Sequence, residues 1–341
     1  MNDTGTRPDA LRRFAETALS ASGVRIEPAS ADASFRSYWR VHGPAGTRIV
    51  MDAPPDKENI APWLEIGARL RSAGLHAPAV EAVDRDQGFV LMEDLGTRLY
   101  LGELDETSAG TLYADALEAL LRMQTDVDPA GLPRFDEAFM TTELELMPEW
   151  FLRRHLGHPI DCDEWDVIEL AFRTLINELR AQPQRFMHRD FHSRNLLVVD
   201  QRNPGLIDFQ GAMIGPVAYD LASLLRDCYI AWEAERVEAW VEGYRANLRH
   251  AQHVDASADA ARFRRWFDLA GLQRHIKVLG IFCRLWYRDG KPHYLADLLL
   301  TWRYVITVAR RYAEIAPLAD LLERALGDRD ITQPRDEALA R

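Results

Sequence analysis

The sequence has few cysteines and no long hydrophobic run. Only three of its 341 residues are cysteines, at positions 162, 228 and 283, and their spacing matches neither a metal site nor a disulfide framework. No run of about 18 apolar residues occurs, so we expect no membrane-spanning helix. The first residues, 1–13, are polar and charged, which is not the pattern of a signal peptide. Together these features predict a cytoplasmic protein.

Positive charge is also scarce. The chain has 41 Lys and Arg against 53 Asp and Glu, which gives a formal net charge of −12. Nucleic acids and anionic membrane surfaces attract basic proteins, so we expect neither as a partner. A length of 341 residues with 47% hydrophobic residues is enough for a large core and predicts two lobes. The sequence leaves the oligomeric state unknown.

The most informative stretch is a short loop with polar residues at fixed spacing. Residues 188–195 read H-x-D-x-x-x-x-N, and an apolar run at 206–207 ends in Asp208. This is the spacing of a phosphoryl-transfer catalytic loop. Each residue alone could be an ordinary turn or cap residue. Short apolar runs flank the loop, however, and turn residues lie at 203–205, so the loop and Asp208 should lie at strand ends. We therefore favour a functional interpretation of the whole set.

Each residue of the pattern has a chemical role in this interpretation. Asp190 would accept the proton of an attacking hydroxyl group. Asn195 and Asp208 would offer oxygen ligands to Mg²⁺ under the phosphates of ATP, because magnesium prefers such ligands. His188 would fix the loop by hydrogen bonding to backbone rather than carry a proton. The sequence therefore predicts an enzyme that uses ATP and Mg²⁺.

These residues resemble the aminoglycoside phosphotransferase family, which has a protein-kinase-like fold. Residues 215–225, with a Gly-Pro pair leading to Asp220 at a helix start, are similar to a family segment, and the resemblance covers roughly residues 24–310. It implies an α+β, bilobal fold: a small antiparallel-sheet lobe that binds nucleotide (1–93), a hinge near 93–96, and a larger helical lobe (94–341) with the active site between them. It also implies that Asp220 is structural and holds the catalytic loop from the helix N-terminus.

Four short sequence segments resemble one branch of this family in particular. Residues 33–41, 51–55, 208–212 and 224–229 are similar to a bacterial branch that phosphorylates N-acetylmuramate and N-acetylglucosamine at the anomeric hydroxyl in peptidoglycan recycling. The resemblance thus implies ATP and an amino sugar as the two substrates. The same machinery could instead act on an aminoglycoside, choline or another small alcohol. A third possibility, from another class, is a nucleotide-binding module without catalysis.

The nucleotide site departs from the family pattern in two ways. The loop at 33–37 lacks G-x-G-x-x-G, and the expected third strand, 48–52, contains no lysine to contact the phosphates. Arg36, Arg40 or Lys57 could supply the positive charge, and the sequence does not choose between them. The resemblance implies that the nucleotide contacts the loop and the backbone of the hinge, through Ser34, Phe35, Arg36, Ser37, Met92, Glu93 and Leu95.

The acceptor sugar should contact arginine and aromatic side chains near Asp190. Aromatic faces pack against the C–H faces of sugar rings, and arginine binds a carboxylate with two hydrogen bonds. Aromatic residues at helical spacing can equally belong to the core. With that alternative open, the predicted substrate-binding residues are Arg194, Arg226, Tyr229 and Trp232.

Apolar periodicity predicts the order of the remaining elements. Short strands are expected between residues 24 and 51 and at 89–92. Beyond residue 327 the chain is charged, and we expect it to fray. The expected helices span 9–20, 59–73, 106–125, 135–155, 163–179, 217–227, 232–248, 258–285 and 295–312.

Overall fold

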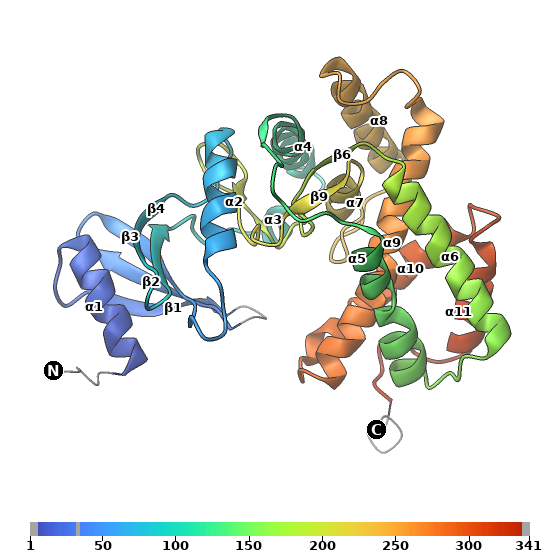
Figure 1. Cartoon of the computed structure of the whole chain (residues 1–341), viewed down its shortest axis with the longest axis horizontal. Coiled ribbons are helices and arrows are strands. Elements are labelled where there is room, and N and C mark those ends of the chain that lie inside the picture. The colour runs from blue at the N-terminus through green and yellow to red at the C-terminus, as the bar shows by residue number, and fades with distance from the viewer. Residues whose placement is uncertain (1–5, 32–34, 336–341) are drawn as a thin grey trace. The chain divides into compact units, whose positions relative to one another are not determined.

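The structure is a computed structural model that describes residues 6–31 and 35–335 (Figure 1). It divides into two compact units, one made of residues 1–119 and 194–211 and the other of residues 120–193 and 212–341. The unit with the sheet therefore extends beyond residue 93, where the sequence predicted a boundary from the change of strands to helices. The predicted lobe boundary at residue 93 and the hinge near 93–96 both stay predictions.

The first unit is built on one five-stranded antiparallel sheet with the order β1-β2-β3-β5-β4. The strands β2 and β3 form a hairpin with a two-residue turn, in which Gly43 pairs with Gly46. Gly46 has a φ of 109°, a conformation that side-chain-bearing residues rarely adopt. The strand bounds are β1 Arg25–Ala31, β2 Ser37–Gly43, β3 Gly46–Asp52, β4 Val80–Asp84 and β5 Phe89–Glu93.

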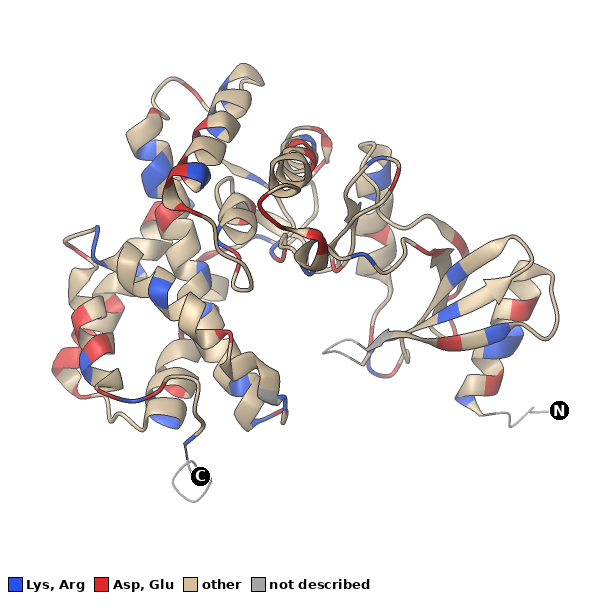
Figure 2. Ribbon diagram, turned by 180° about the vertical axis from the view of Figure 1, so that it is seen from behind, with Lys and Arg blue, Asp and Glu red and all other residues tan. Residues whose placement is uncertain are grey.

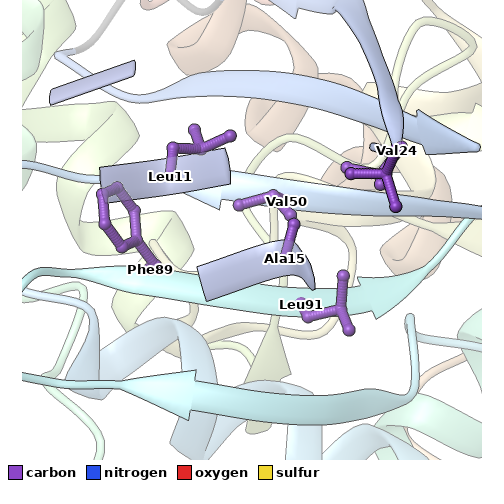
Figure 3. Packing of buried hydrophobic residues seen from close by; sticks show 7 residues of the cluster. Leu11, Ala15, Val24, Val50, Phe89 and Leu91 are labelled. Carbon is purple, nitrogen blue, oxygen red and sulfur yellow. The ribbon is translucent and has the colours of Figure 1, made fainter. Parts of the chain in front are cut away.

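Helix α1 (Arg7–Leu19) covers one face of this sheet. Leu11 and Ala15 of the helix pack against Val50, Phe89 and Leu91 of the strands (Figure 3). Because side chains alternate along a strand, Val50 faces this core while its neighbours on β3 face the other side of the sheet. The second face is therefore left for other contacts, and it carries the pocket described below.

A short hairpin from the middle of the chain completes the first unit. Strand β7 (Leu196–Leu197) pairs with β8 (Gly205–Leu206). The N–H of Leu206 donates to the carbonyl of His76 at 2.8 Å, and the N–H of Val198 donates to the carbonyl of Arg98 at 2.7 Å. These bonds explain why residues 194–211 pack with the sheet. Besides α1, the helices of this unit are α2 Ala61–Ser72, α3 Tyr100–Glu103 and most of α4 Ala109–Asp126.

The second unit is mainly helical. Its longest helix, α9 (Ala260–Tyr287, 28 residues), is buried along most of its length and packs against the π-helix η1, α10, α7 and α6. Acidic and basic residues are interspersed along the helices of this unit (Figure 2). The other elements are α5 Glu137–Leu144, η1 Met147–Leu156, α6 Cys162–Arg180, β6 Gln184–Met187, β9 Met213–Pro216, α7 Tyr219–Leu225, α8 Ala234–His250, η2 Pro292–Leu295, α10 Leu298–Ala309 and α11 Ala316–Leu326.

Two sequence expectations about this unit are wrong. The helix predicted at 135–155 is split into α5 and the π-helix η1, because Pro148 cannot continue an uninterrupted α-helix. The chain after Gly327 does not fray as far as residue 335, since the buried ring of His155 contacts the carbonyl of Ile331 at 2.8 Å. Helix α11 was also not foreseen. Over residues 6–31 and 35–335, no helix is long and apolar enough to span a membrane.

Candidate active site

The catalytic loop begins directly after β6 in the second unit, and Asp220 holds its backbone. One carboxylate oxygen of Asp220 accepts the N–H of His188 at 2.6 Å, and the other accepts the N–H of Arg189 at 3.0 Å. Arg189 has a φ of 78°, which is uncommon for a residue other than glycine and persists only where surrounding contacts enforce it. Asp220 lies fully buried in the first turn of α7. The two bonds therefore fix the backbone that presents Asp190.

A second buried carboxylate, Asp227, holds the far end of the loop. Its Oδ2 accepts the N–H of Ser193 at 2.9 Å and the hydroxyl of the same residue at 2.5 Å. Asp227 is 1% exposed. Sequence reasoning missed this role, because Asp227 lies beyond the C-terminal end of α7 (Tyr219–Leu225) and meets Ser193 only through a contact between residues 34 positions apart.

A buried group of charges from three elements surrounds the loop. Glu143 of α5 accepts the Arg189 guanidinium at 2.8 Å and the Lys277 ammonium at 3.2 Å. It also accepts the side-chain amide of Gln273 at 3.3 Å. Lys277 lies 3.3 Å from the Tyr219 hydroxyl. We call Glu143, Arg189, Gln273 and Lys277 the Glu143 network. Glu143, Gln273 and Lys277 lie outside the catalytic motif and were not found by sequence reasoning, and the partners of Arg189, which lies within the motif, were not foreseen.

These charges set the protonation of the two loop carboxyls. Burial disfavours ionisation of Asp190, but nearby positive charges outweigh burial and lower its pKa to about 2. Asp190 is thus a carboxylate at neutral pH that can accept a hydrogen bond from a hydroxyl group. Burial raises the pKa of Asp220 to about 7, against the two backbone donors that favour its ionised form. The positive charges acting on Asp190 are Lys277, His192, Arg189 and Arg274.

Asn195 and Asp208 lie at the two ends of the β7–β8 hairpin in the first unit. Asn195 directly precedes β7, Asp208 follows β8 by two residues, and the N–H of Ile207 donates to the Asn195 carbonyl at 3.2 Å. Asp208 has a φ of 60°, and its Oδ1 accepts the side-chain amide of Gln210 at 2.6 Å. Both side chains line the same pocket. The expectation that Asn195 and Asp208 flank short strands is confirmed.

This pair of residues fits a magnesium ion bound together with a nucleotide. Mg²⁺ usually keeps several waters and takes one or two protein oxygens plus phosphate oxygens, rather than an all-protein cage. A carboxylate and a side-chain amide in one pocket match that need. In the part of the chain that the structure describes, no cluster of three or more His, Cys, Asp or Glu could hold a metal. An all-protein metal cage is thus not found there.

The pocket has a volume of about 370 Å³, within the range of small-molecule sites. The predicted hinge residues Met92, Glu93 and Leu95 line it, and so does Ile49 of β3. Phe209 forms a further wall and packs on Trp63 of α2, with ring centroids 5.2 Å apart. Apolar walls next to a strand end, with a carboxylate and an amide in the same pocket, suit a flat heterocycle that carries phosphates.

One ion pair and one hydrogen bond hold the side chains of the predicted hinge. Arg40 donates to both oxygens of Asp94, at 2.6 and 3.1 Å, and Asp94 also accepts the N–H of Gly96 at 2.9 Å. His76 contacts the carboxylate of Glu93 at 3.0 Å. These contacts tie the side chains of Asp94 and Glu93 to Arg40 and His76.

The structure describes three of the four predicted nucleotide-loop residues, and Ser34 lies outside the described residues. Phe35 is 64% exposed. Arg36 is almost buried and its guanidinium lies 3.7 Å from Asp208 Oδ1. The Ser37 hydroxyl accepts the indole N–H of Trp39 at 3.0 Å. The loop is thus joined to the predicted magnesium ligand through Arg36.

The predicted substrate-binding residues lie in different surroundings. Tyr229 packs against His192 of the catalytic loop, with ring centroids 5.6 Å apart. Trp232 packs at right angles to Trp240. Arg226 is buried and its guanidinium bonds to Asp268 at 2.5 Å. Arg194, the last of the four, is half-buried and belongs to the first unit. Their contacts with substrate stay predictions.

Comparison with known proteins supports these features. A model of the phosphotransferase enzyme family matches residues 25–255. A protein of Pseudomonas putida named N-acetylmuramate/N-acetylglucosamine kinase is 41% identical over 297 residues, which cover 87% of each chain. A protein of the same name from Neisseria meningitidis is 39% identical over 94% of this chain and 96% of its own. The family resemblance expected from the sequence is confirmed.

Solved structures show the fold. An ADP-bound aminoglycoside phosphotransferase superposes with a TM-score of 0.56 at 15% identity, over 85% of this chain and 96% of its own. An ethanolamine kinase from Plasmodium vivax has a TM-score of 0.60 at 11% identity, over 94% and 93% of the two chains. The predicted α+β, protein-kinase-like fold is therefore confirmed.

Proposed function

The chain belongs to the phosphotransferase enzyme family, and from this premise we propose that it transfers the γ-phosphoryl group of ATP to the anomeric hydroxyl of N-acetylmuramate or N-acetylglucosamine. One observation carries the proposal: relatives named for these two sugars are 39% and 41% identical to this chain over most of both sequences. The product would be a sugar 1-phosphate, suited to the recycling of peptidoglycan sugars.

The pocket of the first unit would bind ATP. Its apolar walls would enclose the adenine, and the hinge backbone at 92–95 would hydrogen-bond the edge of the base. Asn195 and Asp208 would hold Mg²⁺, which neutralises charge on the phosphates when it is bound. The Arg40–Asp94 ion pair and the His76–Glu93 hydrogen bond would hold the hinge in the conformation that binds nucleotide, so binding would cost little conformational entropy there.

Asp190 would act on the sugar hydroxyl. In the transfer, the hydroxyl oxygen bonds to the γ-phosphorus, the bond from that phosphorus to the β–γ bridging oxygen breaks, and ADP leaves with the electron pair. The hydroxyl proton passes to Asp190, which later releases it to water. Because the pKa of Asp190 is lowered to about 2, the carboxylate is a weak base. Its main work is therefore to orient the hydroxyl, and it takes the proton late, as the new bond forms.

The remaining loop residues would support this geometry. His188 and Asp220 would position Asp190 through the backbone. Tyr229, which packs against the loop, and Arg194 would contact the sugar, and Arg194 suits the lactyl carboxylate of N-acetylmuramate. Arg226 and Trp232 have structural partners, so a substrate contact by either would require that partner to be released.

The test is a substrate panel with purified protein and Mg-ATP. N-acetylmuramate, N-acetylglucosamine, an aminoglycoside and choline are compared by ADP release and product mass. We expect phosphate on the two N-acetyl sugars only, and expect it to be lost in mild acid, as anomeric phosphates are. Asp190→Asn should lower kcat by about 10²- to 10⁴-fold, because it removes the proton acceptor. ADP release with only another acceptor would reject the proposed substrate.

ADP binding separates the remaining outcomes. Tight ADP binding without turnover on any acceptor would favour the non-catalytic nucleotide-binding module. If Asp190→Asn also weakened ADP binding more than about twofold, the variant would have disturbed the fold. A second variant, Asp190→Ser, would then be needed to test the role of Asp190 as the proton acceptor.

A further inference from the structure

We propose that Gln210 is a positioning residue that orients the carboxylate of Asp208 for the magnesium ion bound with the nucleotide. This role rests on the proposed function and adds to the same site a residue that acts through Asp208. In the protein-kinase motif D-F-G the third position is glycine, which has no side chain to reach the aspartate. Here the segment is Asp208-Phe209-Gln210, so a side-chain amide lies two residues after the predicted metal ligand.

The side-chain amide of Gln210 bonds directly to the predicted metal ligand. Its Nε2 donates to Oδ1 of Asp208 at 2.6 Å. Asp208 lines the pocket of the first unit and Gln210 does not, so Gln210 would act on the metal through Asp208 and not as a ligand. Hydrogen bonds from neighbouring groups fix the orientation of metal-ligating side chains, and loss of such a partner weakens metal binding.

The backbone next to this carboxylate is held by contacts that do not involve the side chain of Gln210. On one side, the N–H of Ile207 donates to the carbonyl of Asn195 at 3.2 Å. On the other side, the ring of Phe209 is fully buried, and a Cβ added to Gly67 of α2 would lie 3.2 Å from it. The torsions that remain to be fixed are those of the aspartate side chain, and it is this side chain that the amide holds.

A glutamine at this position is not explained by stability of the fold. The other amide atom of Gln210, Oε1, is buried and has no hydrogen-bond partner among residues 6–31 and 35–335. A buried acceptor without a partner lowers stability, so an apolar side chain of the same length would suit the packing better. Such exceptions are expected at functional sites, where the geometry of the site matters more than local stability.

Nucleotide binding with and without Mg²⁺ tests this role without any turnover. The affinity for ADP is measured by calorimetry in Mg²⁺ and in EDTA for the wild type, Gln210→Met and Gln210→Ala. Gln210→Met keeps the length of the side chain but cannot donate, and it should weaken ADP binding in Mg²⁺ by about 10-fold, a loss typical for partners of metal ligands. Binding in EDTA should stay unchanged, because no metal ion takes part there. Gln210→Ala should show the same pattern, because it also lacks the donor.

Gln87→Met is the matched control. Gln87 also donates its side-chain amide to a carboxylate, that of Asp84, at 2.7 Å. Asp84 ends β4, Gln87 lies in the turn before β5, and neither residue lines the pocket. This variant should therefore leave the affinity for ADP unchanged in both conditions. In urea unfolding, Gln210→Met should be no less stable than the wild type, because it removes a buried acceptor that has no partner among the described residues.

Three results would overturn the role of Gln210. Equal losses of ADP affinity in Mg²⁺ and in EDTA would show that the residue shapes the pocket rather than the metal site. Unchanged affinity in both conditions would show that Asp208 binds the metal equally well without the hydrogen bond. A loss confined to Mg²⁺ in Gln87→Met would show that the effect does not depend on a bond to the metal ligand.

Failure of the proposed function gives a different result. Wild type that binds ADP more tightly in Mg²⁺ but phosphorylates no sugar would reject the acceptor and leave the comparison of the Gln210 variants valid. Wild type whose affinity for ADP does not depend on Mg²⁺ would reject both the predicted metal ligands and the role of Gln210.

Discussion

Removing the central charge of the Glu143 network should destabilise the second unit strongly. Glu143→Gln keeps the size and shape of the side chain but leaves Arg189 and Lys277 without their shared carboxylate. The side chains of Glu143 and Lys277 are 9% and 6% exposed, so water cannot replace the lost charge there. Breaking one partner of a buried ion pair typically costs about 3 to 5 kcal/mol. Arg189 is 21% exposed and Asp190 remains nearby, so we expect about 2 to 3 kcal/mol.

Urea unfolding measures this loss. The midpoints and slopes give the change in the free energy of unfolding, provided that the slope is the same in variant and wild type. The matched control is Glu149→Gln, in which the lost partners are Arg153 and Arg154, whose side chains are 48% and 42% exposed. These surface pairs should contribute less than about 1 kcal/mol. The double variant Glu143→Gln/Lys277→Met should be more stable than Glu143→Gln alone, because it also removes one of the two cations that have lost their carboxylate partner.

Two outcomes would contradict this reasoning. If Glu143→Gln were no more destabilising than Glu149→Gln, the buried charges would not be stabilised by Glu143. If the double variant were less stable than Glu143→Gln alone, Lys277 would stabilise the fold through packing and through its contact with Tyr219 rather than through its ion pair with Glu143.

Three further results are expected. Because the folded-state pKa of Asp220 is raised to about 7, its stabilising contribution is full below about pH 4 and is lost as the pH rises through 7. The value of kcat should instead rise with pH, because each carboxylate oxygen accepts one loop N–H and protonation of one oxygen weakens that acceptor. Asp220→Asn should flatten both pH profiles. Asp227→Asn should lower the affinity for sugar or kcat but leave the affinity for ADP unchanged, because it weakens the hydrogen bonds that hold Ser193 in the loop. An equal loss of sugar affinity and ADP affinity would indicate general unfolding. His155→Ala should speed amide hydrogen exchange at 331–335, and an unchanged rate would show that other contacts hold the tail.

The sequence yields candidate functional residues where the chemistry of the reaction restricts their spacing. Asp190, Asn195 and Asp208 lie within one short stretch, and a reaction that needs a proton acceptor beside two oxygen ligands restricts their order and separation. Strand ends next to turn residues are also local features. The loop, its flanking strands and the family could therefore be predicted without a structure.

Residues that depend on distant contacts could not be found in this way. Glu143 and Lys277 are 134 residues apart and meet only because α5 and α9 pack together. Neither helix carries a motif, and a buried Lys on a helix looks in sequence like any solvent-exposed one. The hairpin at 194–211 was assigned to the helical lobe for the same reason, since its bonds to His76 and Arg98 join segments about a hundred residues apart. The π-helix η1 has the same apolar residues as an α-helix, so periodicity did not distinguish them.

The structure also shows why the site needs more residues than Asp190, Asn195 and Asp208. Arg189 and Asp208 both have left-handed backbone conformations, with φ of 78° and 60°, and such conformations are unfavourable for residues with side chains. Each is stabilised by a specific contact: Asp220 accepts the N–H of Arg189, and Gln210 donates to the carboxylate of Asp208. A chain with Asp190, Asn195 and Asp208 but without these partners would lose the backbone conformations that direct the reacting groups. Asp220 and Gln210 are therefore part of the site through the residues that they hold.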